Sequence, residues 1–126
     1  GGTMMRPYLV DSITNYTGSE IRHNVPQSYR KVMTSAEASQ LKEYMEAVVE
    51  EGTGSVLSGK SYTAAGKTGT AEYSMSDSDR THSWFMGFTN VDNPDLVICV
   101  ITEGSDGSPG GKAVSIAADI LDSYYD

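Results

Sequence analysis

The residues with the clearest chemical potential are Lys67, Thr68, Gly69 and Thr70, which read Lys-Thr-Gly-Thr. Lysine supplies a positive charge and three N–H donors, which suit the carboxylate at the end of a peptide. On an extended strand Thr68 and Thr70 face the same side, so their hydroxyls can hold that carboxylate together. Gly69 has no Cβ, and a ligand or a neighbouring chain can therefore approach closely. At a sheet edge the Thr70 N–H could also stabilise a developing oxyanion.

A bare Lys-Thr-Gly is common, and its surroundings make it specific. Residues 51–54 read Glu-Gly-Thr-Gly, and residues 82–88 read His-Ser-Trp-Phe-Met-Gly-Phe. With these flanks the chain resembles the C-terminal part of the transpeptidase domain of class B penicillin-binding proteins. The resemblance is strong over residues 51–104 and looser at both ends. We therefore interpret residues 1–126 as the C-terminal portion of such a domain, and we expect the nucleophile-bearing portion to lie outside it.

The resemblance implies part of a peptidoglycan D,D-transpeptidase, which crosslinks stem peptides ending in D-Ala-D-Ala through an acyl-serine intermediate and binds β-lactams. Lys67, Thr68 and Thr70 would bind the terminal carboxylate. Lys67 would also assist proton transfer, and the Thr70 N–H would complete the oxyanion hole. The family's Ser-x-x-Lys and Ser-x-Asn motifs lie upstream of Lys-Thr-Gly, and no Ser-x-Asn occurs in this chain. We expect the chain to be inactive alone.

The Ser-x-x-Lys match at residues 28–31 and the phosphate-loop match at residues 54–61 both have a structural explanation. Residues 28–31 read Ser-Tyr-Arg-Lys, but their position is wrong and the next helix is predicted to begin only at Thr34, so we interpret them as a polar connector. Residues 54–61 fit the phosphate-binding pattern Gly-x-x-x-x-Gly-Lys-Ser. A phosphate loop joins a strand to a following helix, whereas here a helix precedes and a strand follows. We interpret this segment as a flexible loop that enters the Lys67 strand.

Composition excludes several classes of partner. The 17 acidic and 9 basic residues give a formal net charge of −8, which disfavours nucleic acid and anionic membrane surfaces. The longest apolar run, residues 96–101, is far shorter than the ~20 residues of a membrane helix. Cys99 is the only cysteine and is predicted to be a buried strand residue. The histidines and carboxylates show no metal-ligand spacing, and no metal or cofactor is predicted.

The chain starts at Gly1 and not at an initiator methionine, and no signal peptide is visible in it. This start is consistent with a piece of a longer precursor. By resemblance, we expect the parent to act on the extracytoplasmic face of the bacterial cell membrane, anchored by an N-terminal segment outside this chain. We also expect it to work with the cell-wall synthesis machinery in cell division or cell shape.

Two helices are predicted around the motif. Thr34 followed by Glu37 is a capping box, and the helix it starts is expected to end at Gly52. A second helix should follow Gly110 and Gly111 and pack on the sheet. The apolar stripe of the first helix comprises Ala38, Leu41, Met45 and Val48, and that of the second comprises Ala113, Ile116, Ala117, Ile120, Leu121 and Tyr124.

Strands are predicted over residues 8–13 and 20–25, as a peripheral hairpin, and over residues 62–72, 83–91 and 96–103. A tight turn joins the last two strands and makes them antiparallel neighbours. The fold class is therefore α+β: an antiparallel sheet of three core strands plus the hairpin, with packed helices. By resemblance it is a fragment of the β-lactamase/transpeptidase-like fold. The strands missing from it would leave an exposed edge and a route to self-association.

We expect the residues that flank the motif to have structural roles and not catalytic ones. Trp84, Phe85, Met86 and Phe88 are predicted to be the core of a central strand buried on both faces. His82 is expected to make a structural hydrogen bond, and Glu72 to be solvated. Residues 74–81 are expected to form a polar loop.

Two other functional classes stay open. The first is a serine β-lactamase or a β-lactam sensor domain, which shares the Lys-Thr-Gly strand and would be distinguished by a deacylating water and its base. The second is a non-enzymatic, partner-binding module in which Lys67 is incidental.

Overall fold

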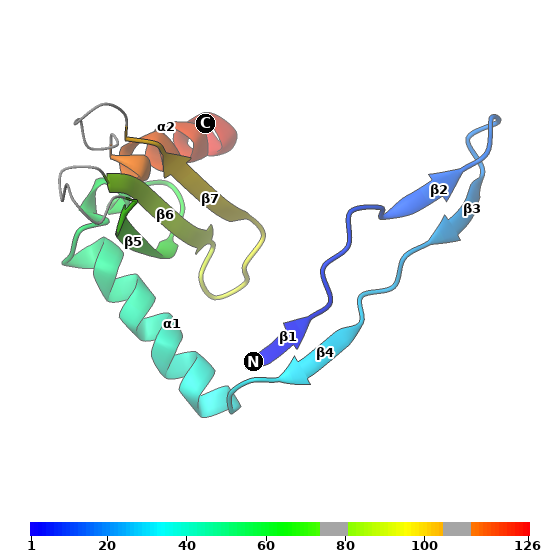
Figure 1. Ribbon diagram of the computed structural model, residues 1–126, viewed down its shortest axis with the longest axis horizontal. Helices are drawn as coiled ribbons and strands as arrows, with labels where there is room; N and C mark the ends of the chain where they lie inside the picture. The colour runs from blue at the N-terminus through cyan, green and yellow to red at the C-terminus, as the bar shows by residue number, and fades with distance from the viewer. Residues whose placement is uncertain (74–80, 105–111) are drawn as a thin grey trace. The chain divides into compact units, whose positions relative to one another are not determined.

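The computed structural model describes residues 1–73, 81–104 and 112–126. The chain forms two compact units, Gly1–Gln40 and Leu41–Asp126, each of which is described by itself (Figure 1). Residues 74–80, most of the predicted polar loop, and the predicted helix start at Gly110 and Gly111 lie outside the described residues. Within the described part of the chain, no helix has the length and apolar character that a membrane crossing needs.

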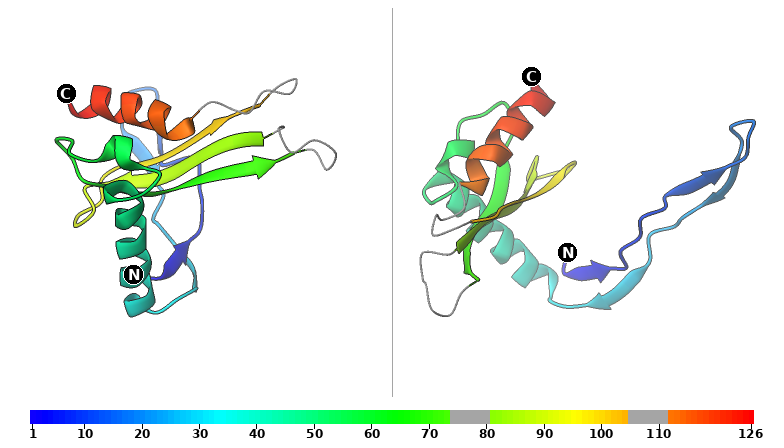
Figure 2. Two further views of the ribbon diagram at one scale, coloured as in Figure 1. Left: turned by 90° about the vertical axis from the view of Figure 1, so that its left-hand side faces the viewer. Right: turned by 45° about the horizontal axis from the view of Figure 1, so that its top comes forward.

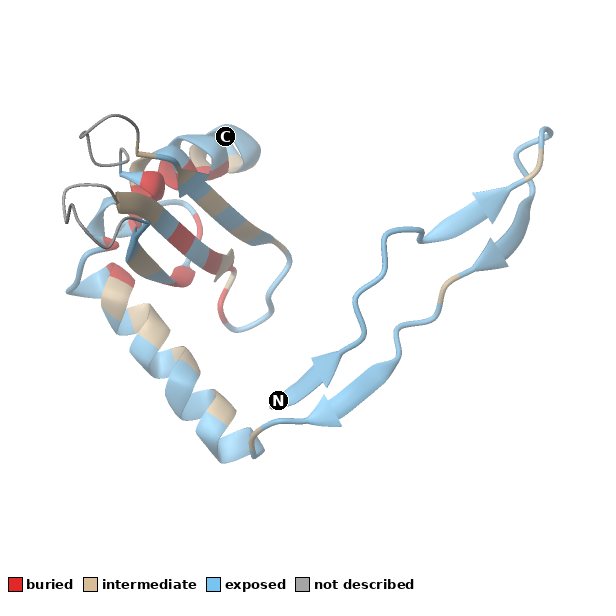
Figure 3. Ribbon diagram, viewed as in Figure 1, coloured by how far each residue is buried: buried red, intermediate tan, exposed pale blue. Residues whose placement is uncertain are grey.

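The first unit is built from two short antiparallel ribbons. β1 (Thr3–Met5) pairs with β4 (Ser28–Lys31), and β2 (Ser12–Thr14) pairs with β3 (Glu20–His23). The predicted hairpin is confirmed as β2 and β3, with shorter strands, whereas the pairing of β1 with β4 had no sequence signal. The Ser-Tyr-Arg-Lys segment is β4, so it is a strand and does not begin a helix. Figure 3 shows that these ribbons bury no side chain.

α1 (Ser35–Glu50) begins at the predicted capping box. The Glu37 N–H donates to Thr34 Oγ1 at 3.2 Å, and the Thr34 N–H donates to Glu37 Oε2 at 2.7 Å. The hydrogen bonds from Thr34 hold the pKa of Glu37 below its usual value. The predicted apolar stripe is partly covered: Leu41 is exposed, whereas Ala38, Met45 and Val48 are half-buried, and the fully buried residue of α1 is the neighbouring Val49.

The second unit contains the three predicted core strands. β5 (Ala64–Glu72), β6 (Thr81–Thr89) and β7 (Val97–Thr102) form an antiparallel sheet in the order β5-β6-β7. β6 is therefore the central strand, as predicted. A turn closed by the Asn90 side chain, whose Nδ2 donates to Asp95 Oδ2 at 2.7 Å, joins β6 to β7.

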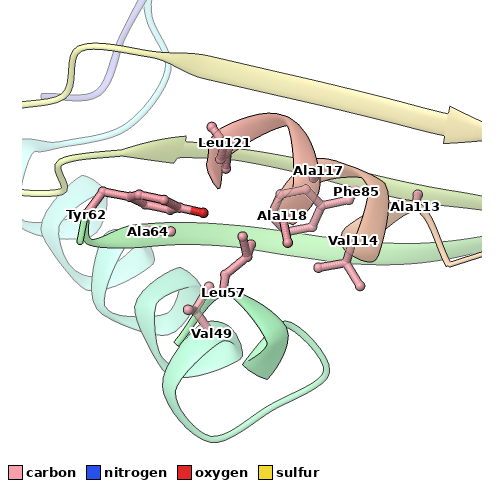
Figure 4. Packing of buried hydrophobic residues seen from close by; sticks show 10 residues of the cluster. All are labelled: Val49, Leu57, Tyr62, Ala64, Phe85, Ala113, Val114, Ala117, Ala118 and Leu121. Carbon is pink, nitrogen blue, oxygen red and sulfur yellow. The ribbon is translucent and has the colours of Figure 1, made fainter. Parts of the chain in front are cut away.

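α2 (Ala113–Tyr125) covers one face of this sheet (Figure 2). Its buried side chains are mostly alanines, which allow the helix backbone to approach the strands, and they belong to the same buried cluster as Phe85. The predicted stripe was partly wrong: Ile116, Ile120 and Tyr124 are exposed. The core in Figure 4 comprises Val49, Leu57, Tyr62, Ala64, Phe85, Ala113, Val114, Ala117, Ala118 and Leu121.

The opposite face of the sheet is open around Trp84 and Met86, which are 40% and 57% exposed. The prediction that both faces of β6 are buried was therefore wrong for these two side chains. Cys99 is also exposed, in contrast to its predicted burial. All three point away from α2, and burial there would need a second layer that the described residues do not provide.

The segment before β5 is not a phosphate loop. It contains a short 3₁₀ turn, η1 (Ser55–Leu57), and then leads into β5, so the order of elements is the one predicted. The turn is anchored, because the Leu57 side chain is fully buried in the core.

The C-terminal half of α2 is tied to this segment by a polar cluster. Lys60 Nζ lies 2.6 Å from Asp122 Oδ2, and the Tyr62 hydroxyl donates to Asp122 Oδ1 at 2.9 Å. These two donors hold the pKa of Asp122 below its usual value. Burial, and then the Asp122 carboxylate, raise the pKa of Tyr62.

Candidate functional site

β5 carries Lys67, Thr68, Gly69 and Thr70 in one uninterrupted extended strand. The Thr68 and Thr70 side chains lie on the face of the sheet that α2 covers, since their partners across the ladder are Phe85 and Ser83. Thr68 is half-buried and Thr70 is exposed. The prediction that the two threonine side chains share one side of the strand is confirmed.

The register of the sheet determines which peptide groups of β5 point away from β6. The Asn90 N–H donates to the Thr63 carbonyl at 2.8 Å, so these residues form a hydrogen-bonded pair just before β5. In an antiparallel ladder, hydrogen-bonded and non-hydrogen-bonded pairs alternate, and this pairing continues without a shift to Glu72. The N–H and C=O groups of Thr68 and Thr70 therefore point outward, at an edge of β5 that no described strand covers.

The Lys67 ammonium lies at the same edge. Lys67 is one residue out of phase with Thr68, so its side chain leaves the opposite face of the strand. Its Nζ donates to the outward-pointing carbonyl of Thr68, and the side chain is exposed. A positive charge thus lies beside the outward-facing peptide groups of β5.

A depression of about 330 Å³ adjoins the threonine side of β5. Thr53, Thr68, Thr70, Ser83 and Lys112 contribute to its lining. Thr53 follows α1, and its Oγ1 lies 2.6 Å from Thr68 Oγ1, within hydrogen-bond distance. The depression therefore joins hydroxyl groups from β5, β6 and the segment after α1 to a second lysine.

Ser83 fixes the start of α2 beside this depression. The Ala113 N–H donates to Ser83 Oγ at 3.1 Å, and Ser83 lies opposite Thr70 in the ladder. This contact holds Lys112, the residue before the helix, close to Ser83 of β6.

The flanking residues behave largely as predicted. His82 Nδ1 accepts a hydrogen bond from the Gly104 N–H at 3.2 Å, which confirms a structural role. The His82 ring also stacks on Tyr73, with ring centroids 4.5 Å apart. Glu72 is exposed, as expected of a solvated carboxylate.

Sequence reasoning did not assign a role to Thr53, Ser83 or Lys112. Thr53 belonged to the Glu-Gly-Thr-Gly segment that made the motif specific, so a signal for its position was present. Ser83 likewise belonged to the flanking segment 82–88, and its place opposite Thr70 follows from the pairing of β5 with β6. Lys112 had no such signal, because its position depends on how α2 folds back over the sheet.

The family model of the penicillin binding protein transpeptidase domain matches residues 1–122. The chain belongs to this family. The resemblance stated from the sequence is thus confirmed, and so is the α+β fold class, since solved transpeptidase domains share the fold of this chain.

Individual transpeptidase relatives cover nearly all of the chain. Stage V sporulation protein D of Bacillus subtilis (strain 168) is 30% identical over 131 residues, which cover 96% of this chain and 20% of that protein. The solved D,D-transpeptidase domain of a peptidoglycan glycosyltransferase from Eggerthella lenta is 29% identical, with a TM-score of 0.79 and coverage of 98% of this chain and 28% of that one.

A third similar structure is the imipenem acyl-enzyme complex of penicillin-binding protein A from M. tuberculosis. It is 25% identical to this chain, with a TM-score of 0.78, and the match covers 99% of this chain and 27% of that one. The chain therefore spans well under a third of the length of these relatives. The roles of Lys67, Thr68, Gly69 and Thr70 stay predictions.

Proposed function

We propose that this chain is the substrate-binding portion of a peptidoglycan D,D-transpeptidase, a penicillin-binding protein that crosslinks stem peptides. The observation that carries the proposal is the outward-facing Thr70 N–H at the free edge of β5, beside the Lys67 ammonium. Support also comes from relatives described as a D,D-transpeptidase domain and as an acyl-enzyme of a penicillin-binding protein.

In the proposed reaction, a serine outside this chain attacks the carbonyl of the penultimate D-Ala. The peptide bond breaks, the terminal D-Ala leaves with a proton on its amine, and an ester forms between the serine and the stem peptide. An amine of a neighbouring stem peptide then attacks the ester, which forms the crosslink and restores the serine hydroxyl. A β-lactam acylates the same serine when its ring amide bond opens.

The residues of this chain bind and orient the donor peptide. An extended stem peptide can lie along the open edge of β5, because the outward N–H and C=O groups of Thr68 and Thr70 offer it strand-like hydrogen bonds. The hydroxyls of the two threonines and the charge of Lys67 attract its terminal carboxylate. The Thr70 N–H stabilises the oxyanion, a donor whose loss typically slows such reactions ~10²–10³-fold, and Lys67 assists proton transfer.

We also propose a location and partners for the complete protein that contains this chain. It would act on the extracytoplasmic face of the cell membrane, anchored by a segment outside this chain, with the cell-wall synthesis machinery in division or shape. Labelling of intact cells by a membrane-impermeant fluorescent penicillin tests the location. Sedimentation of the 126-residue chain tests whether the open β5 edge causes self-association.

Intact-protein mass spectrometry after incubation with benzylpenicillin tests the function. We expect one covalent adduct on the complete protein and none on the 126-residue chain. An adduct on the chain would show that it carries its own nucleophile, and Ser28 would be mapped first. The absence of an adduct on both would refute the proposal and favour a partner-binding module.

A proline scan of β5 tests the role of the Thr70 N–H. In the complete protein, Thr70→Pro removes an amide that points away from β6, so the ladder is retained, and we expect acylation to slow ~10²–10³-fold. Glu72→Pro is the matched control, because the Glu72 amide has the same outward phase but lies beyond the site. Thr70→Val keeps the backbone amide but removes the hydroxyl, so it measures the contribution of the hydroxyl by itself. Equal acylation rates for the two proline variants would contradict the assigned oxyanion donor.

A further inference from the structure

The depression beside β5 contains two residues to which the proposed mechanism assigns no role. Thr53 and Lys112 lie far from the Lys-Thr-Gly-Thr motif in the sequence, yet both contribute to the lining of the depression together with Thr68 and Thr70. Thr53 offers a hydroxyl and Lys112 a positive charge, and both are groups that can bind a carboxylate.

The Thr53 hydroxyl is a hydrogen-bond partner of the Thr68 hydroxyl. The two Oγ1 atoms lie 2.6 Å apart, so one hydroxyl donates to the other. A threonine hydroxyl has a single proton but can accept two further hydrogen bonds. When Thr53 donates to Thr68, the Thr68 proton is left for a ligand, and a carboxylate is the acceptor that favours this order. Thr53 would therefore act through Thr68, as a positioning residue.

A second lysine, other than Lys67, contributes to the lining of the depression. The Lys67 side chain leaves the opposite face of β5, and its Nζ binds the Thr68 carbonyl at the edge. The backbone N–H next to Lys112, that of Ala113, is already bound to Ser83 Oγ. Lys112 is the lysine among the residues that line the depression with the threonines, and its side chain is exposed.

We propose that Thr53 and Lys112 complete the carboxylate subsite, with Lys112 as the cationic partner of the carboxylate and Thr53 as the residue that orients the Thr68 hydroxyl. The inference rests on the proposed transpeptidase function and changes the division of roles within it. Lys67 is left mainly for the reacting centre at the β5 edge, whereas the carboxylate is held in the depression.

The expected effects are moderate, because both side chains are exposed. Loss of one hydrogen bond or one solvent-accessible ion pair typically weakens an interaction by up to about 5-fold. The loss should appear in the concentration of β-lactam that gives half the limiting acylation rate. The limiting rate itself should change less than about 2-fold, because neither residue reaches the reacting carbonyl.

The experiment measures acylation kinetics of the complete protein with benzylpenicillin and with its methyl ester, which lacks the carboxylate charge. We expect Thr53→Ala and Lys112→Gln each to raise the half-saturating concentration of benzylpenicillin about 5-fold. Thr53→Ser, which keeps the hydroxyl, should restore the wild-type value. The ester should be acylated equally slowly by all of these proteins, since it offers no carboxylate to bind.

Matched controls distinguish a local role from a general loss of structure or charge. Ser55→Ala removes a hydroxyl two residues from Thr53, and Lys31→Gln removes a lysine charge on β4; neither should change the kinetics. A Thr53→Ala effect that persists in a Thr68→Ala background would overturn the positioning role. A Lys112→Gln protein with wild-type kinetics, or one equally impaired with the ester, would overturn the role of Lys112.

The wild-type protein separates this inference from the function on which it rests. If benzylpenicillin does not acylate the complete wild-type protein, the proposed function fails and this subsite fails with it. If the wild type is acylated and neither variant shifts the half-saturating concentration, only the subsite is refuted.

Discussion

Alanine substitution at two glycines of β5, Gly66 and Gly69, should have opposite effects on stability. A Cβ at Gly66 would lie 2.6 Å from Phe85 Cζ and 2.8 Å from the Met86 carbonyl oxygen. A Cβ at Gly69 would meet only the Cβ of Trp84, at 3.4 Å, which is ordinary contact. Neither glycine has a positive φ, so steric contact alone separates the two positions.

The magnitudes follow from these contacts. The Phe85 ring is only 1% exposed and cannot retreat, so Gly66→Ala overpacks the core at a cost of about 1–3 kcal/mol. Replacing a strand glycine by alanine stabilises the folded state by about 0.5–1 kcal/mol, because the unfolded chain then has less backbone entropy to lose. The net expectation is a loss of roughly 1–2 kcal/mol for Gly66→Ala and a gain of up to about 1 kcal/mol for Gly69→Ala.

Urea denaturation of the 126-residue chain measures both free energies of unfolding. As an internal check, Phe85→Leu should cost less in the Gly66→Ala background than alone, because the smaller side chain relieves the clash. If the two alanine variants had the same stability, the packing argument would be refuted. If Gly69→Ala folds normally but slows acylation of the complete protein, the glycine is needed by the ligand and not by the fold.

Two further predictions concern titration and exposure. Because its pKa is raised, Tyr62 keeps its hydroxyl proton above about pH 10 in the folded state, whereas the unfolded chain loses that proton. The stabilisation that Tyr62 contributes is therefore fully present below about pH 10 and is lost as the pH rises further. Tyr62→Phe should flatten this alkaline decline in thermal melts, whereas the fully exposed Tyr16→Phe should not. Cys99 is exposed, so a thiol reagent should label it in the native chain nearly as fast as in urea; strong native protection would contradict the open sheet face.

Local sequence patterns predicted the elements around the site well. The capping box of Thr34 and Glu37 depends on residues three apart, and its geometry in the structure is the predicted one. The order of β5, β6 and β7 followed from short apolar runs and one tight turn. Similarly, Thr68 and Thr70 had to share a face once the strand was extended, because side chains alternate along any strand.

Burial was harder to predict, because it depends on which element covers a face. Trp84, Met86 and Cys99 are apolar and lie on strands, yet they point away from α2 and are exposed. On α2 the large side chains Ile116 and Ile120 were expected to pack on the sheet, but alanines occupy that position. No local pattern contains this information, since it arises from contacts between elements distant in the sequence.

The sequence by itself determined the family, the central strand and the four residues of the motif, because these depend on residue types at short spacing. The tertiary structure alone decided that the Thr70 N–H points outward, since that depends on the pairing phase between β5 and β6. It also brought Thr53 within 2.6 Å of Thr68 and placed Lys112 in the same depression. These proximities require the segment after α1 and the start of α2 to come together beside the paired strands β5 and β6, which only the folded chain achieves.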